Sequence, residues 1–210
     1  MAGTWDPAFG RNRALRRCLD LAGYDLSVCQ VDLWGERGDA IVRRRKLAVF
    51  LRSLVAYPVL LWRFARIRKP DIVLVPYPGH FDVPLLAPLC RLRGVPLILD
   101  TFISLYDTIV QDRRLAEPGS LIGRVTRAAD RVACRLPELC ITDTPTHADY
   151  FAGASGVPRD RFRVLWLGAR EDVFYPRPAI DVDSRLVLFH GTFVRLQGLE
   201  TIVQAAKALE

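Results

Sequence analysis

The sequence has few of the residues that build a metal centre or a disulfide framework. Its 210 residues include three histidines and five cysteines, and no two cysteines stand in a C-x-x-C spacing. A scattered, odd set of cysteines argues against a zinc site and against paired disulfides. We therefore expect no metal site, and free, buried thiols in a reducing compartment. The cysteines are Cys18, Cys29, Cys90, Cys134 and Cys140.

Targeting and membrane-spanning signals are also missing. No stretch reaches the roughly 18 uninterrupted apolar residues that a membrane span requires. The first residues carry Asp6, Arg11 and Arg13 and lack the apolar segment of a signal peptide. Neither G-x-G-x-x-G nor a Ser/His/Asp order occurs, so dinucleotide-dependent dehydrogenases and serine hydrolases gain no support. These absences predict a cytoplasmic protein.

The net charge of +7 is concentrated in the first third of the chain. Residues 1–70 hold 14 Lys+Arg against 6 Asp+Glu, whereas residues 71–210 hold 16 against 17. This asymmetry predicts one basic face, which anionic lipid, nucleic acid or phosphorylated substrates could attract. No nucleic-acid reading module is recognisable, so we expect no nucleic-acid partner.

Half of the residues are apolar, and short apolar runs alternate with helical patterns. This alternation predicts an α/β fold with a doubly wound, mostly parallel sheet. No buried strand precedes Thr4, so we expect the first strand to be missing or reduced. Strands are expected at 24–33, 72–75, 95–99, 139–142 and 162–165. Helices are expected at 11–22, 47–67, 83–92, 106–115, 121–136 and 146–152, with a kink or a new start at Pro58 and a stop at Gly94.

The last 25 residues predict the start of a second domain. Residues 186–189 have the pattern of a buried strand, Gly191 that of a turn, and residues 199–209 that of an amphipathic helix. Such a unit normally opens a nucleotide-binding half-domain. We therefore expect an acceptor-side domain at 1–173, a linker at 174–184 and an incomplete second domain at 185–210.

Three stretches resemble the GT-B glycosyltransferases, in particular the retaining family-4-like branch. They are residues 139–150 with Gly156-Val157-Pro158, residues 161–169 with Val173-Phe174-Tyr175-Pro176, and residues 189–198. The resemblance implies two Rossmann-like domains and transfer of a sugar from a nucleotide diphosphate sugar to an acceptor hydroxyl, with retained anomeric configuration. It implies no cofactor and no obligatory metal. The acceptor is a glycan, a lipid-linked molecule or a small molecule.

Residues 189–198 look like the family's glycine-rich donor loop. Gly191 lets the backbone turn sharply close to a ligand, and Gly198 opens a helix whose free amides favour a diphosphate. Thr192 and Gln197 stand where the family usually has Arg and Lys, and Arg195 could supply the missing charge. The family's acidic pair lies farther along its second domain, so we expect a truncated chain that is inactive alone. The predicted donor-binding residues are Gly191, Thr192, Arg195, Gln197 and Gly198.

The acceptor is expected at the carboxyl ends of the strands, where open α/β sheets bind ligands. His80 and Asp100 are the predicted catalytic residues; the alternatives are a hydrogen-bonded loop histidine and a helix N-cap. Acceptor contacts are predicted for Gly79, Asp82 and Thr101. His147, in a predicted first helical turn, is expected at the surface, and His190 is a candidate to line the cleft between the domains.

The helical stretch 47–67 combines apolar and aromatic residues with flanking basic clusters. That composition suits a helix on an anionic membrane surface, and equally a core helix whose arginines extend outward. The first option would place the protein peripherally at the inner face of the membrane. It also supports a second hypothesis, namely a non-catalytic α/β module that binds anionic membrane or a protein partner through its basic first third.

Overall fold

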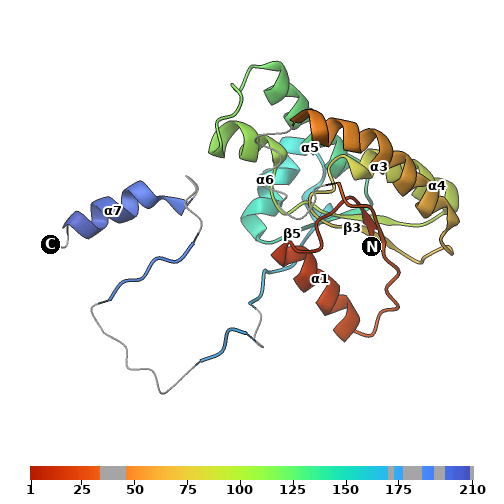
Figure 1. Ribbon diagram of the computed structural model, residues 1–210, viewed down its shortest axis with the longest axis horizontal. Helices are drawn as coiled ribbons and strands as arrows, with labels where there is room; N and C mark the ends of the chain where they lie inside the picture. Colours follow the sequence, from red (N-terminus) through yellow and green to blue (C-terminus); the bar gives the residue numbers. More distant parts are fainter. Residues whose placement is uncertain (34–45, 170–172, 177–185, 192–196, 209–210) are drawn as a thin grey trace.

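The computed structural model describes residues 1–33, 46–169, 173–176, 186–191 and 197–208. It confirms the predicted α/β fold, with parallel strands and helices on both sides of them (Figure 1). Thr192, Arg195 and most of the predicted linker fall outside the described residues.

The strands are short and evenly separated by helices. They are β1 (Ala2–Gly3), β2 (Cys29–Gln30), β3 (Val73–Val75), β4 (Leu97–Asp100), β5 (Leu139–Thr142) and β6 (Phe162–Val164). The α-helices are α1 (Gly10–Leu21), α3 (Lys46–Arg66), α4 (Asp82–Arg93), α5 (Leu121–Arg135), α6 (Pro145–Ser155) and α7 (Leu199–Ala208). A π-helix, η1 (Asp107–Asp112), and a 3-10 turn, η2 (Arg159–Arg161), complete the described elements.

The sheet reverses its strand order at one point. Strands β3, β4, β5 and β6 pair in sequence order, all parallel, and β1 pairs in parallel with β2. β1 lies beside β3, which gives the spatial order β2-β1-β3-β4-β5-β6. The chain therefore winds outward in both directions from the β1/β3 junction. Such a switch point opens a crevice at the carboxyl ends of the strands, where doubly wound sheets bind ligands.

The first strand is present but only two residues long, as the sequence led us to expect. β1 is held to β2 by hydrogen bonds from Cys29 N to Met1 O (2.9 Å) and from Val31 N to Gly3 O (3.2 Å). The strand expected at 24–33 is only two residues long, because β1 offers two residues, Ala2 and Gly3, with which Cys29 and Gln30 pair.

Most buried apolar side chains form one core between the sheet and helices α3 to α6. It includes Leu60 and Phe64 of α3, Leu86 of α4, Leu99 of β4 and Phe151 of α6.

All five cysteines are free; four are buried, but Cys18 is exposed, contrary to our expectation.

Local signals in the sequence set several helix ends. Gly94 follows α4 with φ 60°, as predicted, and Thr144 accepts a hydrogen bond from the His147 amide at the start of α6. The helix expected at 106–115 is instead the π-helix η1. Pro58 neither ends α3 nor starts a new helix. Proline has no N–H for the carbonyl four residues earlier, but Pro58 lies on the exposed side of the helix, where that carbonyl can bind water instead.

The expected buried strand at 186–189 does not form. Leu186, Val187 and Leu188 are exposed and have no strand assignment. A strand gains stability only by pairing with neighbours, and no described strand pairs with this segment. α7 forms as predicted but buries no residue, and it is drawn apart from the sheet in Figure 1. The division into two domains stays a prediction.

Candidate functional site

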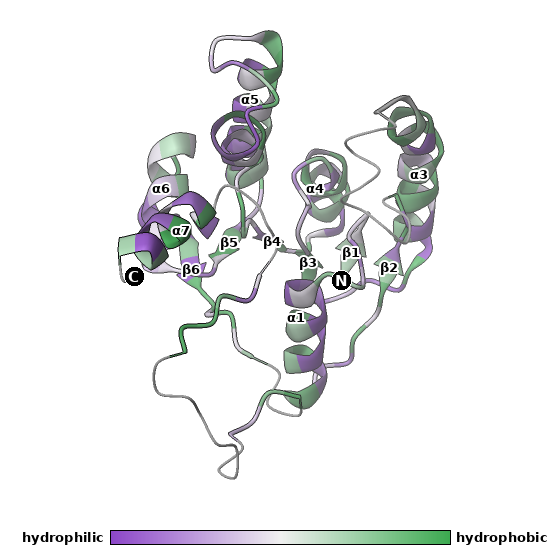
Figure 2. Ribbon diagram, turned by 60° about the vertical axis from the view of Figure 1, so that its left-hand side comes forward, coloured by the Kyte–Doolittle hydropathy of each residue, from purple (hydrophilic) through white to green (hydrophobic). Residues whose placement is uncertain are grey.

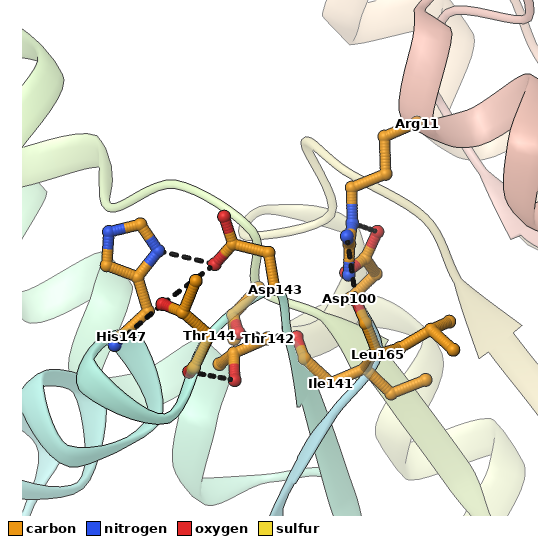
Figure 3. Close-up of polar contacts among 9 residues, drawn as sticks. Arg11, Asp100, Ile141, Thr142, Asp143, Thr144, His147 and Leu165 are labelled. Carbon is orange, nitrogen blue, oxygen red and sulfur yellow. Dashed lines mark hydrogen bonds and ion pairs between the residues drawn. The ribbon is translucent and has the colours of Figure 1, made fainter. Parts of the chain in front are cut away.

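The carboxyl edge of the sheet around the switch point brings together loops from distant parts of the chain. The loop after β1 and the start of α1 meet the start of α4 and the loop after β3. Arg11 of α1 also reaches Asp100 at the end of β4, and the residues after β5 lie nearby (Figure 3). Asn12 of α1, for example, donates to Tyr77 O at 2.6 Å. This edge is where the sequence predicted the acceptor.

Asp100, a predicted catalytic residue, is paired with Arg11 from the first turn of α1. Arg11 Nε lies 2.7 Å from Asp100 Oδ2, and Arg11 Nη2 donates to Asp100 Oδ1 at 2.8 Å. Both side chains are buried, and Arg11 Nη1 also donates to Leu165 O at 3.3 Å, beyond the end of β6. Burial raises the pKa of Asp100, and the hydrogen bonds and charge of Arg11 oppose that rise. In this arrangement Asp100 positions α1 against the sheet, and its direct catalytic role stays a prediction.

Asp82 ties α4 to the loop after β1. Its Oδ2 accepts from the Thr4 amide at 2.7 Å and its Oδ1 from the Thr4 hydroxyl at 2.9 Å. Gly3 is required here, because its φ is 140° and a Cβ would come within 2.5 Å of Asp82 Oδ2. Burial raises the pKa of Asp82 to about 6, opposed by the two hydrogen bonds from Thr4. Asp82 thus holds the start of α4 against the loop after β1 at the switch point, and its contact with the acceptor stays a prediction.

His80 is a buried residue of the loop after β3. Its Nε2 lies 3.3 Å from Asp130 Oδ1, and its ring meets Tyr77 edge to face. Burial lowers the pKa of His80, and the Asp130 charge opposes this effect. Asp130 also accepts from Ser104 Oγ at 2.6 Å and from the amides of Leu105 and Tyr106. The imidazole therefore packs among groups that hold the loop after β4, and its predicted catalytic role stays a prediction.

Gly79 and Thr101 are buried in the same loops. A Cβ at Gly79 would come within 2.3 Å of Val75 Cγ1 and 2.9 Å of Pro76 O, so only glycine fits this turn. The Thr101 amide and hydroxyl both donate to Ile141 O, at 2.9 and 2.8 Å. Both residues shape the site through the backbone, while their predicted contacts with the acceptor remain untested.

Three aromatic rings, which the sequence analysis did not single out, form a half-buried cluster at this edge. Phe9, Tyr77 and Phe102 have ring centroids 5.3 to 5.9 Å apart, and the Arg11 guanidinium lies 4.8 Å from the Phe102 ring centre. Phe102 has φ 37°, a left-handed conformation that a bulky residue rarely adopts. The available signal was an aromatic residue one or two positions after the ends of β3 and β4.

His147 lies at the surface, as predicted. Its Nδ1 is 2.5 Å from Asp143 Oδ1, and its side chain is 46% exposed. Asp143 follows β5 directly, and its charge adds to the rise in the pKa of Asp100. Figure 3 shows the Asp143–His147 pair and the Arg11–Asp100 pair at the same edge of the sheet. This polar pair and the aromatic cluster both reach solvent at this edge.

Of the predicted donor-binding residues, the structure describes Gly191, Gln197 and Gly198. A Cβ at Gly191 would come within 2.5 Å of Gln197 Oε1, so the two ends of the loop lie close together. Gly198 has φ 64°, and its carbonyl accepts from Ile202 N at 3.1 Å, which starts α7. His190 is exposed. No group of three metal-ligating side chains occurs in the part of the chain that was searched, namely its described residues.

The raised pKa of Asp82 predicts a pH-dependent stability. The folded state favours the protonated Asp82 carboxyl. Protonation therefore stabilises the folded protein fully below about pH 4, and this contribution is lost as the pH rises through about 6. Relative to Asp82→Asn, the wild type should lose about 2–3 kcal/mol of unfolding free energy between pH 4 and pH 7.5. Urea denaturation across this range measures the difference. Asp149→Asn, at an exposed carboxylate, should follow the wild-type profile, and parallel profiles for all three proteins would refute the burial argument.

The comparison with known families agrees with this architecture. The family model described as "Glycosyl transferase 4-like domain" matches residues 11–168, which run from α1 past the end of β6. A search of the curated proteins finds no match. The matched segment includes Arg11, Asp100, Asp143 and the aromatic residues Tyr77 and Phe102. Since this match covers more than half of the chain, the protein belongs to the glycosyl transferase 4-like domain family.

Proposed function

We propose that this chain is the acceptor-side part of a retaining glycosyltransferase. It would move a sugar from a nucleotide diphosphate sugar to an acceptor hydroxyl. The family match over residues 11–168 carries the proposal, because it covers the loops that form the carboxyl edge. A glycosyltransferase requires a sugar donor and an acceptor, and this edge offers the polar and aromatic groups that an acceptor would contact.

The acceptor is proposed to lie against the cluster of Phe9, Tyr77 and Phe102. Half-buried rings offer an apolar surface to the C–H face of a sugar or another cyclic acceptor, and few but well-placed polar groups then fix its orientation. Asp143 and His147 are the solvent-accessible polar side chains nearby. The buried pairs Arg11–Asp100 and Asp82–Thr4 would hold these loops in place, so that binding requires little rearrangement.

The donor is proposed to bind at the glycine-rich loop that precedes α7. The free amides at the start of this ten-residue helix, together with Gly191 and Gly198, suit a diphosphate. Thr192, Arg195 and Gln197 are the side chains proposed to grip it. Catalysis would come from orienting the two substrates and stabilising the departing diphosphate, with no metal or cofactor taking part.

Helix α7 buries no residue and residues 186–188 and 190 are exposed, so the described donor-side residues form no enclosure for a nucleotide. We therefore expect this chain alone to bind the acceptor without transferring sugar. The test incubates this chain and the full-length product of its gene with acceptor mixtures and a panel of UDP-, GDP- and ADP-sugars. Release of nucleoside diphosphate is followed, and the anomeric configuration of the product is read by NMR.

Transfer with retention by the full-length product, and none by this chain, is the expected result. A product of inverted configuration would contradict the retaining mechanism. Absence of transfer with every donor, despite binding of acceptor, would favour the non-catalytic module instead.

Removing one ring of the aromatic cluster should weaken acceptor binding. Phe102→Ala should raise the dissociation constant of this chain for the acceptor about tenfold, since the ring contributes on the order of 1 kcal/mol to binding. Tyr24→Ala removes an exposed ring beyond the end of α1 and is the control. Equal dissociation constants for the two variants, with both folded by circular dichroism, would exclude the cluster as the acceptor surface.

A further inference from the structure

Helix α3 is apolar on two opposite sides. One side packs into the core through Ala56, Leu60 and Phe64, which are 5%, 0% and 1% exposed. At 100° per residue, Leu51, Val55 and Trp62 project from the opposite side, and they are exposed. Phe50 and Leu54 extend this patch toward the start of the helix. A surface helix of a soluble domain normally presents polar residues there, whereas no residue that the structure describes covers this exposed apolar side of α3.

The arginines of α3 lie on one flank of the helix, and the sequence of the helix contains no acidic residue. Arg52, Arg63 and Arg66 project between the core side and the exposed apolar side. Arg66 also lies over the Trp62 ring, 4.1 Å from its centre. The sequence from residue 40 to residue 70 contains no Asp or Glu, and Arg68 and Lys69 follow the helix directly. An apolar stripe beside a purely basic flank complements a surface that is apolar beneath a negatively charged layer.

Length and composition alone would allow residues Ala48–Arg66 to span a bilayer. The contacts argue against that orientation. Arg93 of α4 donates to Phe64 O at 2.8 Å and to Ile67 O at 2.7 Å, and Leu60 and Phe64 belong to the main core. Crossing a membrane would remove this side of α3 from the core. In Figure 2 the helix lies at the edge of the domain, beside α4 and β2, where its outer side can meet a flat surface.

We propose that α3 docks the protein onto an anionic phospholipid surface, lying parallel to it. Leu51, Leu54, Val55 and Trp62 enter the headgroup boundary, and the arginines on the flank contact lipid phosphates. A second copy of this chain is a poorer occupant, because its own α3 contains no acidic residue that could pair with these arginines. The inference goes beyond sugar transfer and does not depend on it.

The test is flotation of the intact chain with vesicles of neutral phosphatidylcholine, with and without about one-third phosphatidylglycerol. Binding is expected to the anionic vesicles only and to weaken with salt, since the phosphate contacts are screened. The double substitution Leu51→Glu with Leu54→Glu should weaken binding at least about tenfold. Leu92→Glu with Leu121→Glu makes the same chemical change at exposed leucines of α4 and α5, and should bind like the wild type.

Tryptophan emission reports on the orientation. A blue shift on binding should occur in the wild type and be strongly reduced in Trp62→Phe, which keeps the apolar contact. Equal binding to neutral and anionic vesicles would overturn the proposal, as would equal losses in the two double variants. A concentration-dependent dimer in sedimentation velocity that disappears only in the α3 variant would show that a second copy covers this face.

Discussion

The buried ion pair between Arg11 and Asp100 is the constraint on which the carboxyl edge of the sheet depends. Two charges removed from water are tolerated only when each is neutralised and fully hydrogen-bonded. Asp100 receives three hydrogen bonds from Arg11 Nε and Nη2, and the third guanidinium nitrogen, Nη1, donates to Leu165 O. The pair therefore fixes the start of α1 to the ends of β4 and β6, three segments far apart in the sequence.

The exposed features of the edge follow from this arrangement. With Arg11 fixed, its guanidinium lies against Phe102 and helps to hold that residue in its left-handed conformation beside Phe9 and Tyr77. The Asp82–Thr4 contact joins the loop after β1 to the start of α4 at the switch point. The predicted catalytic residues His80 and Asp100 and the predicted acceptor contact Asp82 are all buried, whereas the three rings are half-buried at the same edge. This division suits an enzyme that acts mainly by orienting substrates.

Local patterns in the sequence were enough to predict the fold class, the main strands and several helix ends. The apolar run at 72–75 predicted β3, Gly94 predicted the end of α4, and the helix expected at 146–152 lies within α6. The partner of Asp100 was not predictable, because Arg11 lies 89 residues away and nothing local links the two. The same limit applies to the burial of His80, which depends on packing against Asp130 of α5. The strand expected at 186–189 shows the converse case, since its apolar pattern is present but no described neighbour pairs with it.

A double-mutant cycle on Arg11 and Asp100 tests the central claim most directly. Arg11→Met alone leaves a buried carboxylate without its partner and should cost about 3–5 kcal/mol of unfolding free energy, whereas adding Asp100→Leu should recover most of that loss. Arg159→Met, at the exposed pair with Asp149, should cost less than about 1 kcal/mol. A coupling energy near zero between Arg11 and Asp100, in urea denaturation at pH 7, would contradict the account.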